Sequence, residues 1–138
     1  MSNLELYPVQ TRDILSIADE VLPILNSFHE HNPRVPTNTV SIFESLFKGE
    51  KLLWVGKREE VIEMILVTEF HCQSLFVGIW ATKSGWDFNI WYDLIMEKLE
   101  QFARYFGCSE LRAITRKGLA KKIKQDWDHE SCLLFKTI

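Results

Sequence analysis

The stretch IWATKSGWDFNIW, residues 79–91, contains the residues of this sequence that are best placed to bind an anion. Its first residues predict a buried strand, and the spacing of apolar residues after Asp87 predicts a helix. The first backbone N–H groups of a helix lack partners within it, and the helix dipole makes them attractive to phosphate. However, Ser84 precedes Asp87 by three residues, a spacing that resembles a capping box. We therefore expect the corner to be self-capped, with Lys83 offsetting only part of the charge of Asp87.

The sequence predicts neither a metal site nor a disulfide framework. The cysteines are odd in number and the histidines form no HxxxH or HExxH motif: Cys72, Cys108, Cys132, His29, His31, His71 and His129. Widely spaced cysteines of this kind are typical of reduced thiols in a cytosolic protein. We expect Cys108 and Cys132 to pack in the core, since neither has an adjacent histidine in sequence and burial would raise the pKa of the thiol.

A basic segment lies between Arg112 and Lys124, in a chain whose net charge is −3. The segment carries +6 and no acidic residue, so the rest of the chain carries −9. The segment could bind the phosphates of a nucleic acid or an acidic surface of a protein partner. The simpler interpretation is a helix face exposed to solvent. No aromatic residue is interleaved with the basic ones, as single-stranded nucleic acids would require, so we do not expect nucleic-acid binding.

The length and composition predict one folded domain, residues 1–138. The chain is 46% hydrophobic and contains five tryptophans, which argues against disorder. The N-terminal MSNLELYPVQ lacks the profile of a signal peptide, and no apolar run is long enough to span a membrane. We expect a soluble cytoplasmic protein.

The periodicity of apolar residues predicts the element order β-α-α-β-β-β-α-β-α-β. The expected strands cover residues 4–9, 51–55, 61–70, 74–81, 110–115 and 132–137, and the expected helices cover residues 11–28, 39–48, 87–106 and 118–125. Thr11 is the expected N-cap of the first helix, and Pro23 is expected to kink or split it. In the second helix, Phe43, Leu46 and Phe47 are the expected inward residues.

The central part of the chain predicts how the strands are joined. Residues 56–59 are the expected turn of an antiparallel hairpin, and Gly107 is expected to end the long helix. The run LFVGIWA has no polar alternation, so it belongs at the centre of the sheet. The strand-helix-strand unit over residues 74–115 predicts a right-handed parallel crossover.

This order of elements, together with four segments, resembles the GNAT acetyltransferase superfamily. The segments are VIEMILVTEF, LFVGIWATKSGW, the helix through Gly107, and GCSELRAITRKGLAKKIK. The resemblance extends from about Leu52 to the C-terminus, and it is strongest to the small GNAT-like proteins that tailed bacteriophages encode. It implies an α/β GNAT-like fold, with a mixed central sheet and helices on both faces.

The resemblance also implies a place for acetyl-CoA. In this family the cofactor lies along the central strand, and its pyrophosphate lies on the N–H groups that open the next helix. The matching positions are Ile79, Trp80, Ala81, Lys83, Ser84, Gly85 and Trp86. Gly78 within the strand is expected to mark a bulge or a close backbone approach. Trp86 would either plug the cofactor cleft or form a contact for another protein, and the basic segment could bind the 3′-phosphate.

Acetyl transfer to an amine needs a base, and the resemblance places it near the end of the strand before the central one. Glu69 and His71 are the candidates there, with Glu63 as an alternative. The simpler interpretations are a solvated residue at a strand end for Glu69 and an exposed turn histidine for His71. The family's thiolate acid is commonly a tyrosine on the short helix near the C-terminus, and GLAKKIKQDW contains none.

Two functions follow from the resemblance. The first is a GNAT-fold protein of phage origin whose acetyltransferase activity is weak or lost, and which binds a protein partner in a virion, a packaging complex or the host. The second is an active N-acetyltransferase that uses acetyl-CoA. Because the corner has a single glycine and carries Asp87, we expect weak or no acetyl-CoA binding.

Overall fold

The computed structural model describes residues 3–33, 35–114, 128–130 and 133–138. The expectations for Arg116–Lys124, for the helix at 118–125 and for Cys132 lie outside the described residues. The strands are β1 (Leu4–Pro8), β2 (Leu52–Arg58), β3 (Val61–His71), β4 (Ser74–Thr82), β5 (Glu110–Ile114), β6 (Asp128–Glu130) and β7 (Leu133–Thr137). The helices are a short 3-10 turn, η1 (Thr11–Asp13), followed by α1 (Ile14–His31), α2 (Thr39–Phe47) and α3 (Phe88–Tyr105).

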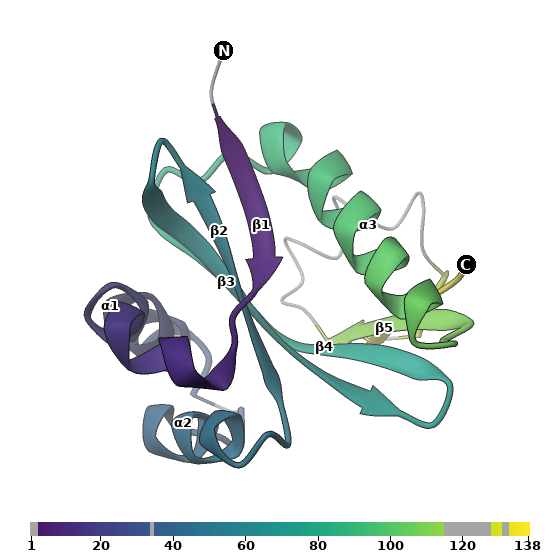
Figure 1. The fold of residues 1–138 in the computed structure, drawn as a ribbon, viewed down its shortest axis with the longest axis horizontal. Coiled ribbons are helices and arrows are strands. Elements are labelled where there is room, and N and C mark those ends of the chain that lie inside the picture. The colour runs from purple at the N-terminus through teal and green to yellow at the C-terminus, as the bar shows by residue number, and fades with distance from the viewer. Residues whose placement is uncertain (1–2, 34, 115–127, 131–132) are drawn as a thin grey trace.

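The strands form one mixed sheet in the order β1-β2-β3-β4-β5-β7-β6. Strands β1 to β4 pair antiparallel, whereas β4 and β5, which the long helix α3 connects along the chain, pair parallel (Figure 1). The expected antiparallel meander and the parallel pair are therefore confirmed, and β4 has the central position that its apolar run predicts.

Helices cover both faces of the sheet, and each face has its own apolar core. The core under α3 includes Trp54, Trp80, Trp91 and Leu111, whereas the core under α1 and α2 includes Leu25, Ile65 and Ile79. In Figure 1, α1 and α2 lie together at one side of the sheet, and α3 crosses the other. Side chains alternate between faces along a strand, so each strand contributes to both cores.

Two bulges interrupt this alternation. The β2–β3 register passes from Gly56↔Met64 to Lys57↔Ile62, which leaves Glu63 as an extra residue in β3. The β3–β4 register passes from Val67↔Ile79 to Thr68↔Val77, which leaves Gly78 as an extra residue in β4. The expected bulge at Gly78 is confirmed, and it turns the next residues of β4 to the opposite faces.

Several sequence expectations for the N-terminal half are wrong. Helix α1 is not split at Pro23, because Pro23 lies on its exposed side, where water can solvate the carbonyl that the proline cannot engage. The expected kink there stays a prediction. Asp13, not Thr11, is the N-cap of α1. In α2, Phe47 is 42% exposed, whereas Ile42 is buried beside Leu46.

The β2–β3 turn also lies later than expected, at Glu59 and Glu60, and residues 56–58 belong to β2. Both glutamates have positive φ, the conformation of a tight hairpin turn that normally favours asparagine and glycine. Asn3 holds the turn in place, since it accepts from the Glu59 N–H at 3.1 Å and its own N–H donates to Glu59 Oε1 at 2.9 Å. Strand β6 was not predicted at all.

A buried hydrogen bond joins β2 to β3 beside the second bulge. Trp54 Nε1 donates to Thr68 Oγ1 at 3.0 Å, and both residues are 1% exposed. Replacing Thr68 by valine keeps the shape but leaves the indole N–H unpaired, so we expect Thr68→Val to lower the free energy of unfolding by about 1–3 kcal/mol. The same change at the partly exposed Thr82 of β4 is the control, and a comparable loss there in urea denaturation would contradict the assignment.

Candidate functional site

Strands β4 and β5 separate halfway along β4. Their parallel pairing runs from Ser74↔Glu110 to Val77↔Ala113 and ends there, one residue before the Gly78 bulge. Strand β4 continues to Thr82, whereas β5 ends at Ile114 and pairs with β7 on its other side. Among the described residues, no strand pairs with Gly78–Thr82 on this edge. We call this region the fork.

The corner after β4 is tied to the first bulge. Lys83 N–H donates to the carbonyl of Glu63 at 2.8 Å, and Trp86 N–H donates to the carbonyl of Lys83 at 3.2 Å. Gly85 has a φ of +82°, a left-handed conformation in which a glycine is favoured. The extra residue in β3 therefore fixes where the chain leaves the sheet.

Asp87 is the N-cap of α3, and its Oδ1 accepts from the N–H of Asn89 at 2.9 Å. The expectation of a self-capped corner is confirmed for this donor. The expected capping box is wrong, however, because Asp87 occupies the cap position itself and Ser84 lies in the turn before it. The turn at Gly85 accounts for the difference, since it delays the start of the helix to Phe88.

Trp86 packs against the core rather than standing free on the surface. Its ring lies 6.4 Å from that of Trp80, 6.5 Å from that of Trp91 and 6.2 Å from that of Phe88, as measured between ring centroids. The indole N–H groups of Trp80, Trp86 and Trp91 are all buried without a hydrogen-bond partner among the described residues. The aromatic cluster therefore packs at the start of α3, and none of the described residues accepts a hydrogen bond from its three indole N–H groups.

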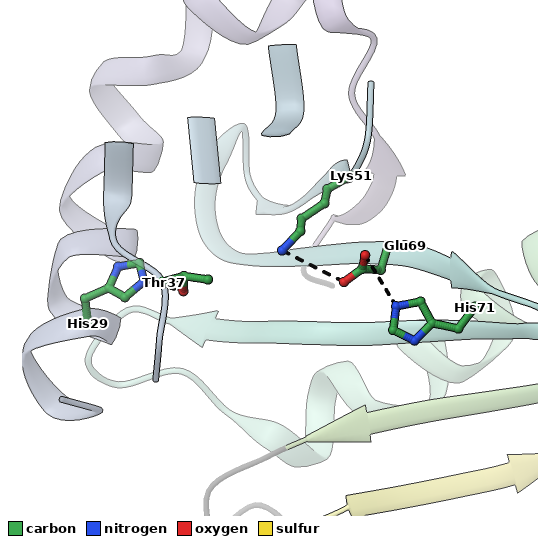
Figure 2. A network of polar contacts seen from close by, with 5 residues as sticks. All are labelled: His29, Thr37, Lys51, Glu69 and His71. Atoms are coloured by element: carbon green, nitrogen blue, oxygen red, sulfur yellow. Dashed lines mark hydrogen bonds and ion pairs between the residues drawn. The ribbon is translucent and has the colours of Figure 1, made fainter. Parts of the chain in front are cut away.

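The two candidate bases form one cluster at the opposite end of β4 (Figure 2). Glu69 Oε2 lies 3.4 Å from His71 Nε2, and Glu69 Oε1 lies 3.9 Å from Lys51 Nζ. The imidazole of His71 stacks on the ring of Phe76 at 4.8 Å. The side chain of Glu69 is 27% exposed and that of His71 is 50% exposed, so both can meet a solute.

Strand register places this cluster next to the fork. Glu69 is opposite Phe76, which immediately precedes the last paired residue, Val77. Its neighbours Thr68 and Phe70 contact Trp54 and Phe102 on the α3 side, so Glu69 and His71 lie on the other face, which α1 and α2 partly cover. The second polar contact in Figure 2, His29 Nε2 to Thr37 Oγ1 at 3.1 Å, links α1 to the loop before α2.

The predicted site residues therefore fall into two groups. Phe76 and Lys83 are seven residues apart on an extended strand, a separation of roughly 23 Å. The corner residues Lys83–Trp86 thus lie far from Glu69 and His71, and the fork lies between them. Ile79 and Ala81 face the core under α1, and Trp80 faces the core under α3, so at these positions the backbone borders the fork.

The alternative base, Glu63, is less available. Its Oε1 lies 3.4 Å from Arg58 Nε, close enough for ion pairing but not in hydrogen-bond geometry, and both atoms are buried. Cys108 is 7% exposed, and burial raises the pKa of its thiol, which confirms a packing role.

Sequence reasoning missed a polar group on β4 and β5. Glu110 Oε1 accepts from Ser74 Oγ at 3.1 Å and from Arg112 Nε. The hydrogen bond from Arg112 lowers the pKa of Glu110 from its ordinary value of 4.5, against a smaller opposing effect of burial. The alternation of charged and apolar residues in ELRAI could have revealed that Glu110 and Arg112 share a face.

Within the described residues, no group of three or more histidine, cysteine, aspartate or glutamate side chains could hold a metal ion. No helix among the same residues combines the length and apolar character that a membrane span requires.

Comparison with solved structures shows that the chain has the GNAT acetyltransferase fold. A probable acetyltransferase from Staphylococcus epidermidis superimposes with a TM-score of 0.72 at 10% identity, covering 98% of this chain and 99% of that one. PaiA N-acetyltransferase from Thermoplasma acidophilum, solved with coenzyme A, gives 0.67 at 7% identity and 99% coverage of both chains. A GNAT family acetyltransferase from Brucella melitensis, solved with acetyl-CoA, gives 0.66 at 13% identity, covering 99% of this chain and 88% of that one.

Neither a protein-family model nor a curated protein matches the sequence. The likeness to these acetyltransferases is therefore one of fold.

The cap at Asp87 can be tested by stability. We expect Asp87→Ala to lower the free energy of unfolding by about 1 kcal/mol, because it removes the acceptor for Asn89 N–H. Asp87→Ser keeps a capping oxygen, so its loss should be no more than a few tenths of a kcal/mol. The measurement is the midpoint of urea denaturation, with the m-value unchanged between variants. An equal loss of unfolding free energy in Asp87→Ala and Asp87→Ser would argue against capping.

Proposed function

We propose that the protein is an N-acetyltransferase that uses acetyl-CoA, and that Asp87 lowers its affinity for that substrate. The observation that carries the proposal is the fork. Strand β4 continues for five residues, Gly78–Thr82, after its pairing with β5 has ended. Backbone groups on that free edge can pair with the amides of an extended ligand, as they would with another strand.

The fit to the rest of the substrate is uneven. The fork suits the amide-bearing arm of acetyl-CoA, whereas the start of α3 is less suited to the pyrophosphate. Asp87 already occupies the Asn89 donor and adds a negative charge where an anion would have to lie. Trp86 narrows the same corner, since its ring packs between those of Trp80 and Trp91.

In the proposed reaction, acetyl-CoA supplies an acetyl group as a thioester. The neutral amine forms a C–N bond to the acyl carbon while the C–S bond breaks, and the departing thiolate takes up the proton that the nitrogen loses as the amide forms. An alkylammonium cannot attack, so one proton must first pass from the acceptor to the protein. Glu69 and His71 provide the receiving atoms, because they lie 3.4 Å apart next to the fork and are partly exposed.

Lys51 has a positioning role in this proposal. Its ammonium lies 3.9 Å from Glu69 Oε1, which leaves Oε2 directed at His71. His71 in turn is held flat against Phe76. The imidazole and the carboxylate therefore have a defined relative orientation, as a pair that shares a proton requires.

The affinity for acetyl-CoA should depend on the charge of Asp87. We expect the unmodified protein to bind acetyl-CoA more weakly than micromolar, as measured by isothermal titration calorimetry. Asp87→Ser keeps the cap but removes the charge, and it should tighten binding about fivefold, because a unit charge at about 4 Å in water is worth about 1 kcal/mol.

Asp93→Asn is the matched control for this measurement. It removes a carboxylate from the exposed side of the same helix, further from the corner, and should leave the affinity unchanged. Micromolar or tighter binding by the unmodified protein would show that the corner accepts a pyrophosphate despite Asp87.

The base is tested by turnover. We expect Glu69→Gln to lower kcat at least about 100-fold, the usual contribution of a general base, while the melting temperature changes little. Glu63→Gln, on the same strand but paired with Arg58, should leave kcat nearly unchanged. Unchanged turnover in Glu69→Gln would remove this residue as the base, and a selective effect of Glu63→Gln would transfer the role to Glu63.

The capped corner favours a second proposal, in which the GNAT fold has kept its shape but lost turnover. The protein would then act by binding a partner, and the resemblance to phage GNAT-like proteins suggests a virion, a packaging complex or a host factor. A thermal-shift titration with acetyl-CoA separates the two proposals, because a ligand of the native state raises the melting temperature by mass action.

A further inference from the structure

The sheet face that carries Glu69 also carries an arginine at the same level, two strands away. Register pairs Glu69 with Phe76, and Phe76 with Arg112, so these three residues form one row across β3, β4 and β5. A second row, one step nearer the β3–β4 hairpin, contains His71, Ser74 and Glu110. We call these six residues the acceptor platform.

All six residues lie on one face of the sheet. Leu75, Val77, Leu111 and Ala113 belong to the core under α3, so Ser74, Phe76, Glu110 and Arg112 alternate to the opposite face. The printed contacts agree, because His71 stacks on Phe76 and Ser74 Oγ donates to Glu110. The side chains of His71 and Arg112 are 50% and 47% exposed, so this part of the face is open to solutes.

The platform separates opposite charges by an aromatic surface. Glu69 lies at one side and Arg112 at the other, roughly 10 Å apart at their Cα atoms since two strand spacings separate them. Between them lies the stack of His71 on Phe76, with rings 11° from parallel. Glutamate and arginine side chains are long enough to bring both charges within reach of one small molecule that lies over Phe76.

Arg112 retains free binding capacity. Glu110 engages its Nε, and no other described residue contacts the guanidinium through a hydrogen bond or an ion pair. Guanidinium carries five N–H donors, and its terminal groups bind carboxylate or phosphate in a two-point fashion. Glu110 thus engages one nitrogen of the guanidinium, and the Arg112 side chain is 47% exposed.

We propose that the acceptor is an amine that also carries an anionic group, with Arg112 binding the anion while Glu69 and His71 receive the ammonium. This inference rests on the proposed acetyltransferase function, whose catalytic pair lies at one side of the platform. The aromatic stack favours an acceptor with a flat or apolar side chain that packs on it beside the two charged groups. Amino acids and the N-termini of short peptides belong to this class.

The experiment compares two amines that differ only in the anion. L-phenylalanine has a carboxylate, and L-phenylalaninamide replaces it by a neutral carboxamide. Calorimetric binding to the full chain should favour L-phenylalanine about tenfold, the effect of a charged hydrogen-bonding pair. Arg112→Gln should abolish the preference, and Arg112→Lys should keep part of it because the charge remains without the two-point geometry.

Arg104→Gln is the matched control, since Arg104 is an exposed arginine of α3 and should not affect the preference. Equal binding of the two amines, no binding of either, or a preference that survives Arg112→Gln would each overturn the inference. If the melting temperature shows that Arg112→Gln fails to fold, Arg112→Lys and the two-amine comparison still decide it.

Turnover with acetyl-CoA separates this inference from the proposed function. A carboxylate preference in binding with no acetylation of any amine would support the platform and contradict the acetyltransferase. Acetylation of both amines at equal kcat/KM would support the acetyltransferase and contradict the platform.

Discussion

One inserted residue, Gly78, links the packing of this protein to its candidate site. Before the bulge, Leu75 and Val77 face the core under α3, whereas after it Ile79 and Ala81 face the core under α1 and α2. The same residue follows the last β4–β5 pair, where the two strands separate. Removing the insertion would turn every later side chain of β4 to the wrong core. Apolar burial on both faces therefore fixes the position of the Gly78 bulge, at which the described β4–β5 pairing ends.

At the corner, capping and anion binding compete for the same donors. A helix start that receives a phosphate must leave its N–H groups unpaired in the free protein, which costs stability. Here Asp87 satisfies Asn89, and the packing of Trp86 against Trp80 and Trp91 buries aromatic surface beside it. Within the described residues, the three indole N–H groups are buried without a protein hydrogen-bond partner.

Sequence patterns predicted the strands and helices that depend on local periodicity. They failed for turns and side-chain groups whose conformation depends on contacts between distant residues. The apolar run of β4, the stripe of α3 and the glycine after it were sufficient to place the central strand, the long helix and the parallel pair. The turn at Glu59 and Glu60 was not predictable, because Asn3 stabilises a conformation that glutamate alone disfavours. Likewise, Asp87 was recognised as a capping residue, but its position in the cap depended on the left-handed turn at Gly85. The group of Ser74, Glu110 and Arg112 needed the strand register, which relates residues 36 positions apart.

The two faces of the sheet divide the proposed chemistry. The corner and Trp86 pack with the α3 core, whereas Glu69, His71 and Arg112 lie on the face away from α3. An acceptor on that face and a thioester in the fork approach β4 from different directions, and they meet where pairing with β5 ends. Under the two proposals, a change at Asp87 would alter the affinity for the acyl donor and would leave the affinity of the acceptor platform for its ligand unchanged. A protein that bound its acyl donor weakly could thus retain selectivity for its acceptor, since the residues responsible share no contact with the corner.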